Sequence, residues 1–144
     1  NLGDVMKESA QIAYQYIKAH PELTGMTYEE FSEKDIHVHV PEGAVPKDGP
    51  SAGITVTVAL ISALTGMYVR HDVAMTGEIT LRGRVLPIGG LREKTMAAYS
   101  AGVKTVLIPA DNERDLENID PLARENLTFI PCRVAEDVLK NALL

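Results

Sequence analysis

Residues 41–66 read PEGAVPKDGPSAGITVTVALISALTG and divide into two parts with opposite conformational preferences. Residues 41–50 contain three prolines and two glycines, a composition that excludes a helix or a central strand and predicts a shaped loop. Residues 51–65 are apolar on most faces, which is typical of a helix buried in a core, and Gly66 follows as a stop signal. The segment therefore predicts a loop that delivers Ser51 to the N-terminus of a buried helix.

Helices and strands are expected to alternate around this buried helix. The spacing of apolar residues predicts helices at 4–19, 91–101 and 134–143. Apolar alternation and β-branched residues predict strands at 36–40, 72–76, 105–108 and 128–130. A short acidic helix is expected after the third of these strands, capped by Asp111 or Asn112.

The connection Arg82-Gly83-Arg84 separates Thr80–Leu81 from Val85–Leu86 and predicts a hairpin or tight turn. Strands that alternate with helices, interrupted by one hairpin, indicate an α/β domain with a mixed sheet and alternating helices. The length of 144 residues suits a single domain spanning residues 1–144. Because the chain starts at Asn1 directly with a helical pattern, we expect it to be part of a longer protein.

Composition and charge exclude several classes of protein. The chain is 45% hydrophobic and 24% charged, an ordinary globular balance. Its net charge of −6 argues against a nucleic-acid surface, which needs a basic patch. The longest apolar stretch, residues 54–64, is too short to span a bilayer, and no signal-peptide pattern is present. The single cysteine, Cys132, cannot form an internal disulfide, which is consistent with a reducing compartment.

Two loops share one design, in which a backbone rich in Gly or Pro delivers a polar side chain to a helix N-terminus. They are residues 47–53, KDGPSAG, and residues 89–94, GGLREK. The free N–H groups and dipole of a helix N-terminus can stabilise phosphate or the oxyanion of acyl transfer. Gly53 is expected to let a substrate backbone approach closely.

Ser51 is most simply an N-cap, and the alternative is a nucleophile, which needs a partner base. Two sets of candidates are present. The first is His37 or His39, with Asp48 completing a triad, and the second is Lys94. Lys94 is either a solvated surface lysine or, in the first turn of its helix, an amine that the dipole and burial favour in its neutral form.

Other polar residues support or compete with these assignments. Thr76 follows Val73-Ala74-Met75 at the end of the predicted strand 72–76. It is either a plain strand residue or a hydroxyl that makes a direct hydrogen bond to the Lys94 amine. Glu93 is then expected to point away, since a carboxylate would hold the ammonium form. His37 and His39 share one strand face and could bind a metal, but no third ligand is evident, which favours a structural role.

Four segments resemble signature blocks of the A-type Lon proteases of bacteria and mitochondria, and together they span the chain in order. They are residues 35–44, 46–53, 74–83 and 86–94. The resemblance implies the Lon proteolytic-domain fold, which is similar to the second domain of ribosomal protein S5. It also implies a Ser-Lys dyad, with Ser51 as nucleophile and Lys94 as general base, and it places Thr76 beside the lysine.

The resemblance further implies an ATP-dependent serine endopeptidase of protein quality control, which hydrolyses unfolded or damaged polypeptides. Such enzymes assemble as hexamers and couple the proteolytic domain to an AAA+ ATPase. The chain has no G-x-x-x-x-G-K-[ST] motif, so we expect no cofactor in it, and ATP and Mg²⁺ in an ATPase domain absent from it. An N-terminal part of the proteolytic domain is also expected to be absent. The implied compartment is the bacterial cytoplasm, or alternatively the mitochondrial matrix, with no membrane.

The expected reaction is acyl transfer, with the backbone N–H groups of Ser51 and Ala52, together with Gly49, holding the oxyanion. His37 and His39 are then supporting or structural residues. Two alternatives remain. One is a phosphate-binding domain of the small-molecule kinase type, which also uses a Gly/Pro/Ser loop before a buried helix. The other is a non-catalytic Lon-like assembly module, which would need neither Ser51 nor Lys94.

Overall fold

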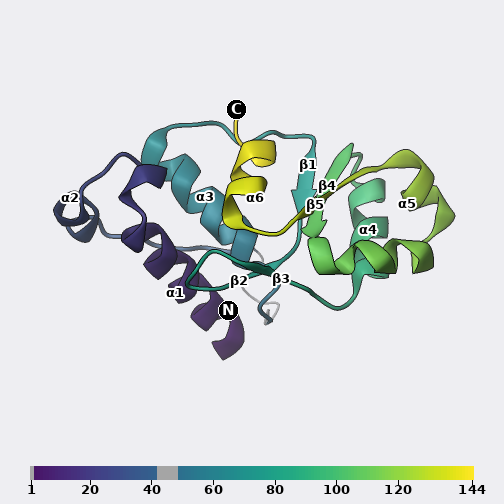
Figure 1. Ribbon diagram of the computed structural model, residues 1–144, viewed down its shortest axis with the longest axis horizontal. Helices are drawn as coiled ribbons and strands as arrows, with labels where there is room; N and C mark the ends of the chain where they lie inside the picture. Colours follow the sequence, from purple (N-terminus) through teal and green to yellow (C-terminus); the bar gives the residue numbers. More distant parts are fainter. Residues whose placement is uncertain (1, 42–48) are drawn as a thin grey trace.

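A small parallel sheet divides the molecule into two layers of helices (Figure 1). The computed structural model describes residues 2–41 and 49–144. The sheet has the order β1-β4-β5, with parallel pairing throughout. Its strands are β1 (Val73–Met75), β4 (Thr105–Pro109) and β5 (Thr128–Cys132).

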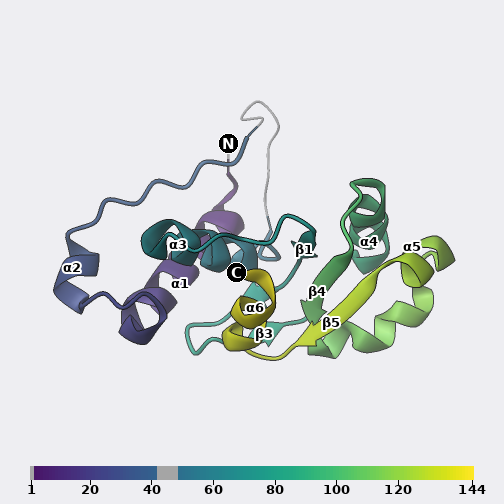
Figure 2. The same ribbon diagram turned by 90° about the horizontal axis from the view of Figure 1, so that it is seen from above.

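Helices cover both faces of this sheet (Figures 1 and 2). One layer consists of α1 (Asp4–Ala19), α3 (Gly53–Thr65) and α6 (Ala135–Ala142). The other consists of α4 (Leu91–Ser100), α5 (Pro121–Asn126) and the 3-10 helix η2 (Ala110–Asn118). The short helices η1 (Pro21–Leu23) and α2 (Tyr28–Ser32) follow α1 at the end of the molecule away from the sheet.

Alternation along the strands creates two separate hydrophobic cores. In β4, Leu107 packs into the core formed with α1, α3 and α6, whereas its neighbours Val106 and Ile108 pack into the core formed with α4 and α5. Successive side chains of a strand point to opposite faces, so three consecutive residues of β4 contribute to both hydrophobic cores. Since β4 is the central strand, it is nearly continuously apolar, as expected for a parallel strand covered on both sides.

An antiparallel hairpin lies beside the parallel sheet and completes the fold. It consists of β2 (Glu78–Ile79) and β3 (Val85–Leu86), with Ile79 opposite Val85. The expected combination of α/β elements with parallel and antiparallel pairing is therefore confirmed, but the two kinds of pairing belong to separate sheets. The helices predicted at 4–19, 91–101 and 134–143, the strands predicted at 72–76, 105–108 and 128–130, and the turn at Gly83 are confirmed to within a few residues.

The predicted strand 36–40 is wrong, although its pattern has a physical meaning. Ile36, Val38 and Val40 are partly buried, while His37 and His39 are exposed, so the expected alternation of burial is present. A strand, however, also needs backbone hydrogen bonds to a neighbour. No segment within residues 2–41 or 49–144 pairs with it. Its apolar side chains are therefore partly buried although its backbone forms no strand pairing with a described residue.

The acidic segment after β4 also differs from its prediction. It forms the 3-10 helix η2 from Ala110, and neither Asp111 nor Asn112 caps it. Asn112 is instead buried, with its side chain bonded to the backbone of Ile88. The helix α5, which the sequence analysis did not predict, begins with Asp120 as a true N-cap that accepts from the N–H of Leu122.

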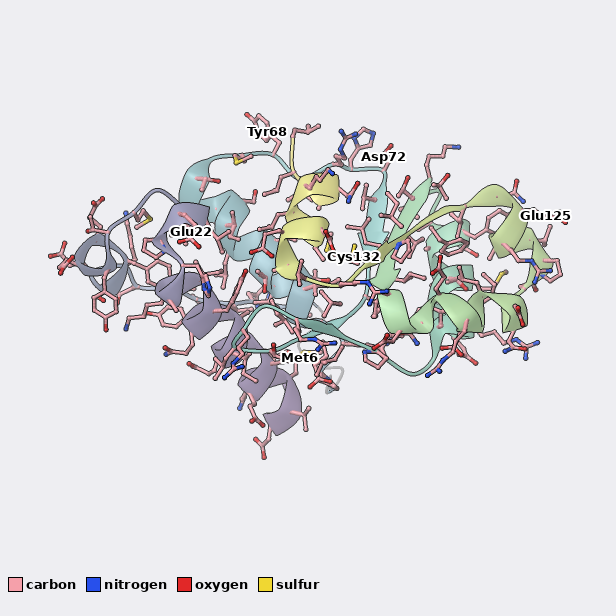
Figure 3. All side chains as sticks on the ribbon, viewed as in Figure 1. Met6, Glu22, Tyr68, Asp72, Glu125 and Cys132 are labelled. Carbon is pink, nitrogen blue, oxygen red and sulfur yellow. The ribbon has the colours of Figure 1, made fainter. Side chains whose placement is uncertain are left out.

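Several large apolar side chains near the C-terminus are exposed, namely Met67, Tyr68, Val69 and Leu144. Tyr68 is 78% exposed and lies close to the C-terminus (Figure 3), where its carbonyl accepts from the N–H of Leu144.

Cys132, in contrast, is fully buried at the end of β5, where burial and then Asp137 raise the pKa of its thiol to about 11. No helix within the described residues is long and apolar enough to cross a membrane.

The hairpin turn depends on a glycine for two reasons. Gly83 has a φ of +82°, and a Cβ at this position would lie 2.6 Å from Cε1 of Tyr16. The ring of Tyr16 is buried, and its hydroxyl donates to Glu136 Oε1 at 3.3 Å. Burial first, and then Glu136, raise the pKa of Tyr16 to about 12. Tyr16 thus joins α1, the hairpin turn and α6.

We expect Gly83→Ala to destabilise the fold more than Gly102→Ala. Gly102 also has a φ of +82°, but a Cβ there meets no atom within 4 Å, so both variants carry the left-handed backbone cost of about 1–2 kcal/mol. Gly83→Ala adds a clash with Tyr16, which costs a further ~1–3 kcal/mol. Urea denaturation measures the difference. Equal losses in the two variants would show that the Tyr16 contact does not constrain the turn.

Candidate active site

Two helix N-termini from opposite layers meet at the carboxyl end of β1. Ser51 lies in the turn that precedes α3, and Lys94 lies in the first turn of α4. Lys94 Nζ and Ser51 Oγ are 2.9 Å apart and form a hydrogen bond. The structure therefore brings together the two side chains that the sequence analysis selected as nucleophile and base.

The backbone on both sides of Ser51 is held by three different elements. Gly77, which follows β1, donates its N–H to the carbonyl of Ser51 at 2.9 Å and accepts from the N–H of Ile54 at 3.1 Å. The carbonyl of Pro50 accepts from Ser9 Oγ of α1 and from the N–H of Gly53, each at 3.2 Å. These contacts fix the turn, so the Ser51 hydroxyl has a defined position relative to the sheet.

Gly53 does not have the role expected of it. Gly53 is buried, and a Cβ there would lie 2.9 Å from the backbone nitrogen of Ile79 and 3.0 Å from Ser9 Oγ. The missing side chain therefore lets α3 approach β2 and α1. It does not leave room for a substrate backbone.

The N-cap interpretation of Ser51 is also wrong. The helix α3 begins at Gly53, its N-cap is Ala52, and no side chain caps it. Within the described residues the N–H groups of Ser51 and Ala52 donate no hydrogen bond. Ser51 therefore presents its hydroxyl to Lys94 and does not cap α3.

The environment of Lys94 favours its neutral form. Burial lowers the pKa of its amine below the ordinary value of 10.5, because desolvation disfavours the ammonium. The amine lies in the first turn of α4, where the dipole also opposes a positive charge. Glu93 is exposed and forms no ion pair with Lys94, both of which lie in the described part of the chain. No carboxylate therefore contributes to the shift of the pKa.

Thr76 lies beside this site but does not make the contact predicted for it. Its side chain is 7% exposed, and its backbone N–H donates to the carbonyl of Leu107 at 3.1 Å. No hydrogen bond joins Thr76 to Lys94, both described residues, and the amine instead bonds to Ser51 Oγ. Thr76 connects the end of β1 to Gly77, and it anchors that connection to β4.

The histidine alternative has no support in the geometry. His37 and His39 are exposed, and neither ring makes a hydrogen bond to Ser51 or another described residue. Asp48, the third member of that alternative, lies outside the described residues, and Gly49 is the first described residue after it. Among residues 2–41 and 49–144 there is no group of three His, Cys, Asp or Glu side chains that could hold a metal ion.

Two residues that position Ser51 were missed by the sequence analysis. Gly77 resembles any loop glycine in sequence, yet a Cβ there would lie 2.9 Å from Val85 Cγ1 and 3.1 Å from Ile54 Cδ1. Ser9 is buried within α1. The available signal was a small polar residue at a position where an amphipathic helix turns toward the core.

Comparison with known proteins gives one consistent result. Residues 1–144 match the Lon protease (S16) C-terminal proteolytic domain. Among similar proteins are the Lon protease of Brevibacillus choshinensis, 59% identical over 142 residues, Lon protease 1 of Myxococcus xanthus, 58% over 143, and Lon protease 1 of Bacillus subtilis (strain 168), 57% over 143. Each alignment covers 99% of this chain and 18% of the relative, so the chain spans less than a fifth of the length of these proteins.

We expect the Lys94 amine to lose its proton at a pH below 10.5, because burial disfavours the ammonium. The fraction of neutral amine then rises as pH increases through this lowered pKa. NMR of chain labelled at lysine Cε and Nζ measures the titration, and Lys94→Met assigns the signal. Ser51→Ala should leave the direction of the shift unchanged, because desolvation is its cause. A titration at or above 10.5 would contradict the account of the site.

Proposed function

This chain belongs to the Lon protease family as its proteolytic domain, which makes it a serine-type peptidase domain, and we propose that Ser51 and Lys94 are its catalytic dyad. The observation that carries the proposal is the 2.9 Å contact between Lys94 Nζ and Ser51 Oγ. A nucleophile within hydrogen-bond reach of a base is the arrangement that acyl transfer requires.

In the proposed first step, neutral Lys94 accepts the hydroxyl proton of Ser51 while Ser51 Oγ attacks the carbonyl carbon of the scissile bond. The carbon–oxygen bond of the acyl-enzyme forms, and the carbonyl oxygen becomes an oxyanion. The ammonium of Lys94 then donates its proton to the leaving amine as the peptide bond breaks. A lysine with a lowered pKa suits both transfers, because its neutral form accepts the proton and its ammonium returns it to the leaving group.

The oxyanion has donors close to the nucleophile. The N–H groups of Ser51 and Ala52 donate to no described residue, and Pro50 has no N–H to offer. We propose that these two groups, with that of Gly49, stabilise the oxyanion. In the second step, water attacks the acyl-enzyme with Lys94 again accepting the proton, and Ser51 is released.

We propose that the substrates are unfolded or damaged polypeptides, delivered by an AAA+ ATPase module of a longer homo-hexameric protein in the bacterial cytoplasm. The relatives named Lon protease are more than five times longer than the aligned segment, which leaves room for such a module. ATP and Mg²⁺ would act there, because the residues of this chain do not fit them. The loop before Ser51 has Pro50 where a P-loop has its lysine, and Ala44 where a P-loop has its first glycine.

Ser51→Ala is expected to abolish peptide cleavage, by ~10³-fold or more, while the fold persists. Lys94→Arg should be almost as inactive from pH 6 to 10, because guanidinium does not deprotonate in this range. Hydrolysis of a fluorogenic peptide measures the loss. A peptide boronate or fluorophosphonate should modify Ser51, as located by mass spectrometry.

The exposed histidines provide matched controls for these variants. His37→Ala and His39→Ala should retain most of the activity, since neither ring contacts Ser51. Losses in these variants equal to that of Ser51→Ala, with folding unaffected, would favour the histidine triad. Substantial activity of Lys94→Arg would mean that the base lies elsewhere. Modification of a different residue would remove Ser51 from the mechanism.

The isolated chain is not expected to bind ATP, because no segment of it has the phosphate-binding design of a P-loop. Isothermal titration calorimetry with Mg-ATP should give no saturable heat in the millimolar range. A nucleotide kinase of known affinity is the positive control. Saturable binding would instead favour a phosphate-binding domain of the kinase type.

A further inference from the structure

Asn112 is a buried polar residue that the dyad mechanism does not use. It lies in η2, on the side of the sheet that carries α4, and only 2% of it is exposed. Its Oδ1 accepts from the N–H of Ile88 at 2.8 Å, and its Nδ2 donates to the carbonyl of Ile88 at 3.0 Å. One side chain therefore satisfies both backbone groups of a residue that lies 24 positions earlier in the chain.

Ile88 needs this partner because the hairpin cannot supply one. Continuing the β2–β3 register would place Ile88 opposite Thr76. The N–H of Thr76 is already donated to Leu107, however, and the next residue, Gly77, is bonded to the turn that carries Ser51. The backbone of residues 76–77 therefore makes its hydrogen bonds to β4 and to the start of α3, and none to Ile88. The side-chain amide of Asn112 supplies the two hydrogen bonds that a neighbouring strand would give Ile88.

Asp115 fixes the orientation of the Asn112 amide. Asp115 Oδ2 accepts from Asn112 Nδ2 at 2.8 Å, from the same helix η2. A flipped amide would direct its oxygen toward both this carboxylate and the carbonyl of Ile88, and its NH₂ group toward the N–H of Ile88. All of these contacts would be repulsive. The side chain therefore has one orientation, and it can hold Ile88 in one register only.

The link between Ile88 and the start of α4 consists of two glycines with few restraints of their own. Gly89 and Gly90 are exposed, and a Cβ at Gly89 would meet no atom within 4 Å. Gly90 has a φ of +74° and is the N-cap of α4. Two glycines allow many backbone conformations, so the start of α4 is defined by the anchored Ile88 before it and the buried Leu91 after it.

We propose that Asn112, oriented by Asp115, is a positioning residue that sets the place of Lys94 relative to Ser51. The two arms of the hairpin position different members of the dyad. The arm that contains Gly77 holds the Ser51 turn, and the arm that contains Ile88 leads to Lys94 and is held by Asn112. The inference rests on the proposed function for its catalytic consequence, but the placement of the amine is measurable without catalysis.

Asn112→Ala tests the inference through two readouts on the same chain. The first is the NMR titration of the Lys94 amine, whose pKa should return toward 10.5 because the amine leaves its desolvated position. The second is the rate of Ser51 labelling by a fluorophosphonate as a function of pH. This rate should fall several-fold below the pKa of the amine, with its profile displaced to higher pH, because a higher pKa leaves a smaller neutral fraction at a given pH.

Matched variants separate positioning from general stability. Asn141→Ala also removes an amide-to-carbonyl hydrogen bond, of 2.7 Å to Asp137 in α6, and should change neither readout. Asp115→Asn keeps an acceptor for Asn112 and should label within ~3-fold of the unmodified chain. Asp115→Ala should give an intermediate loss, and it serves as the principal test if Asn112→Ala does not fold.

The outcomes distinguish this inference from the proposed function. An unchanged Lys94 titration in folded Asn112→Ala, or in Asp115→Ala where the first variant is unfolded, would overturn the positioning role. An equal shift in Asn141→Ala would also overturn it, because the effect would then reflect loosening of the whole fold. Absence of Ser51 labelling in the unmodified chain would count against the dyad, while the titration would still decide the placement of Lys94.

Discussion

The backbone of Gly77 is the constraint on which the rest of the site depends. Its N–H and carbonyl bond to Ser51 and Ile54, on either side of the first turn of α3. A side chain at this position would displace its neighbours, because a Cβ would lie 2.9 Å from Val85 Cγ1. Since Gly77 also links β1 to the hairpin, the contact joins the layer of α1, α3 and α6 to the strand edge where α4 begins.

The meeting of two helix N-termini has an electrostatic consequence. Both positive dipole ends disfavour an ammonium and favour an anion. Before the reaction, burial lowers the pKa of Lys94, so that the amine can be neutral next to the Ser51 hydroxyl. In the proposed mechanism, N–H groups at these helix N-termini would stabilise the oxyanion after attack, and the new ammonium and the oxyanion would attract each other. In the proposed chemistry, the positive ends of the two helix dipoles thus favour both the neutral amine before attack and the oxyanion after it.

The sequence predicted the parts of the fold that depend on local pattern. The buried helix α3 and the strand β4 have unmistakable apolar runs, and the turn predicted at Arg82-Gly83-Arg84 is present, with a positive φ at Gly83. The Lon-type α/β fold is confirmed, and the matched residues 35–40 belong to it even though they form no ladder. Ser51 and Lys94 were selected because each follows a Gly-rich loop at a helix start. Their 2.9 Å contact, however, depends on how two layers meet.

What could not be predicted are interactions between segments far apart in the chain. Nothing in the sequence near Asn112 indicates that it pairs with Ile88, and an acidic helix cap was the simpler interpretation. The expected hydrogen bond of Thr76 to Lys94 is likewise absent, and the sequence could not show that the amine extends to Ser51 Oγ across the two layers.

The central claim is that Ser51 and Lys94 act as one catalytic unit, and a double-mutant cycle tests it most directly. Residual peptide hydrolysis would be measured for Ser51→Ala, Lys94→Met and the combined variant. If Lys94 acts only by activating Ser51, the combined variant should be no slower than either single variant. Losses that multiply in the combined variant would show that the two side chains contribute independently, and would contradict the account.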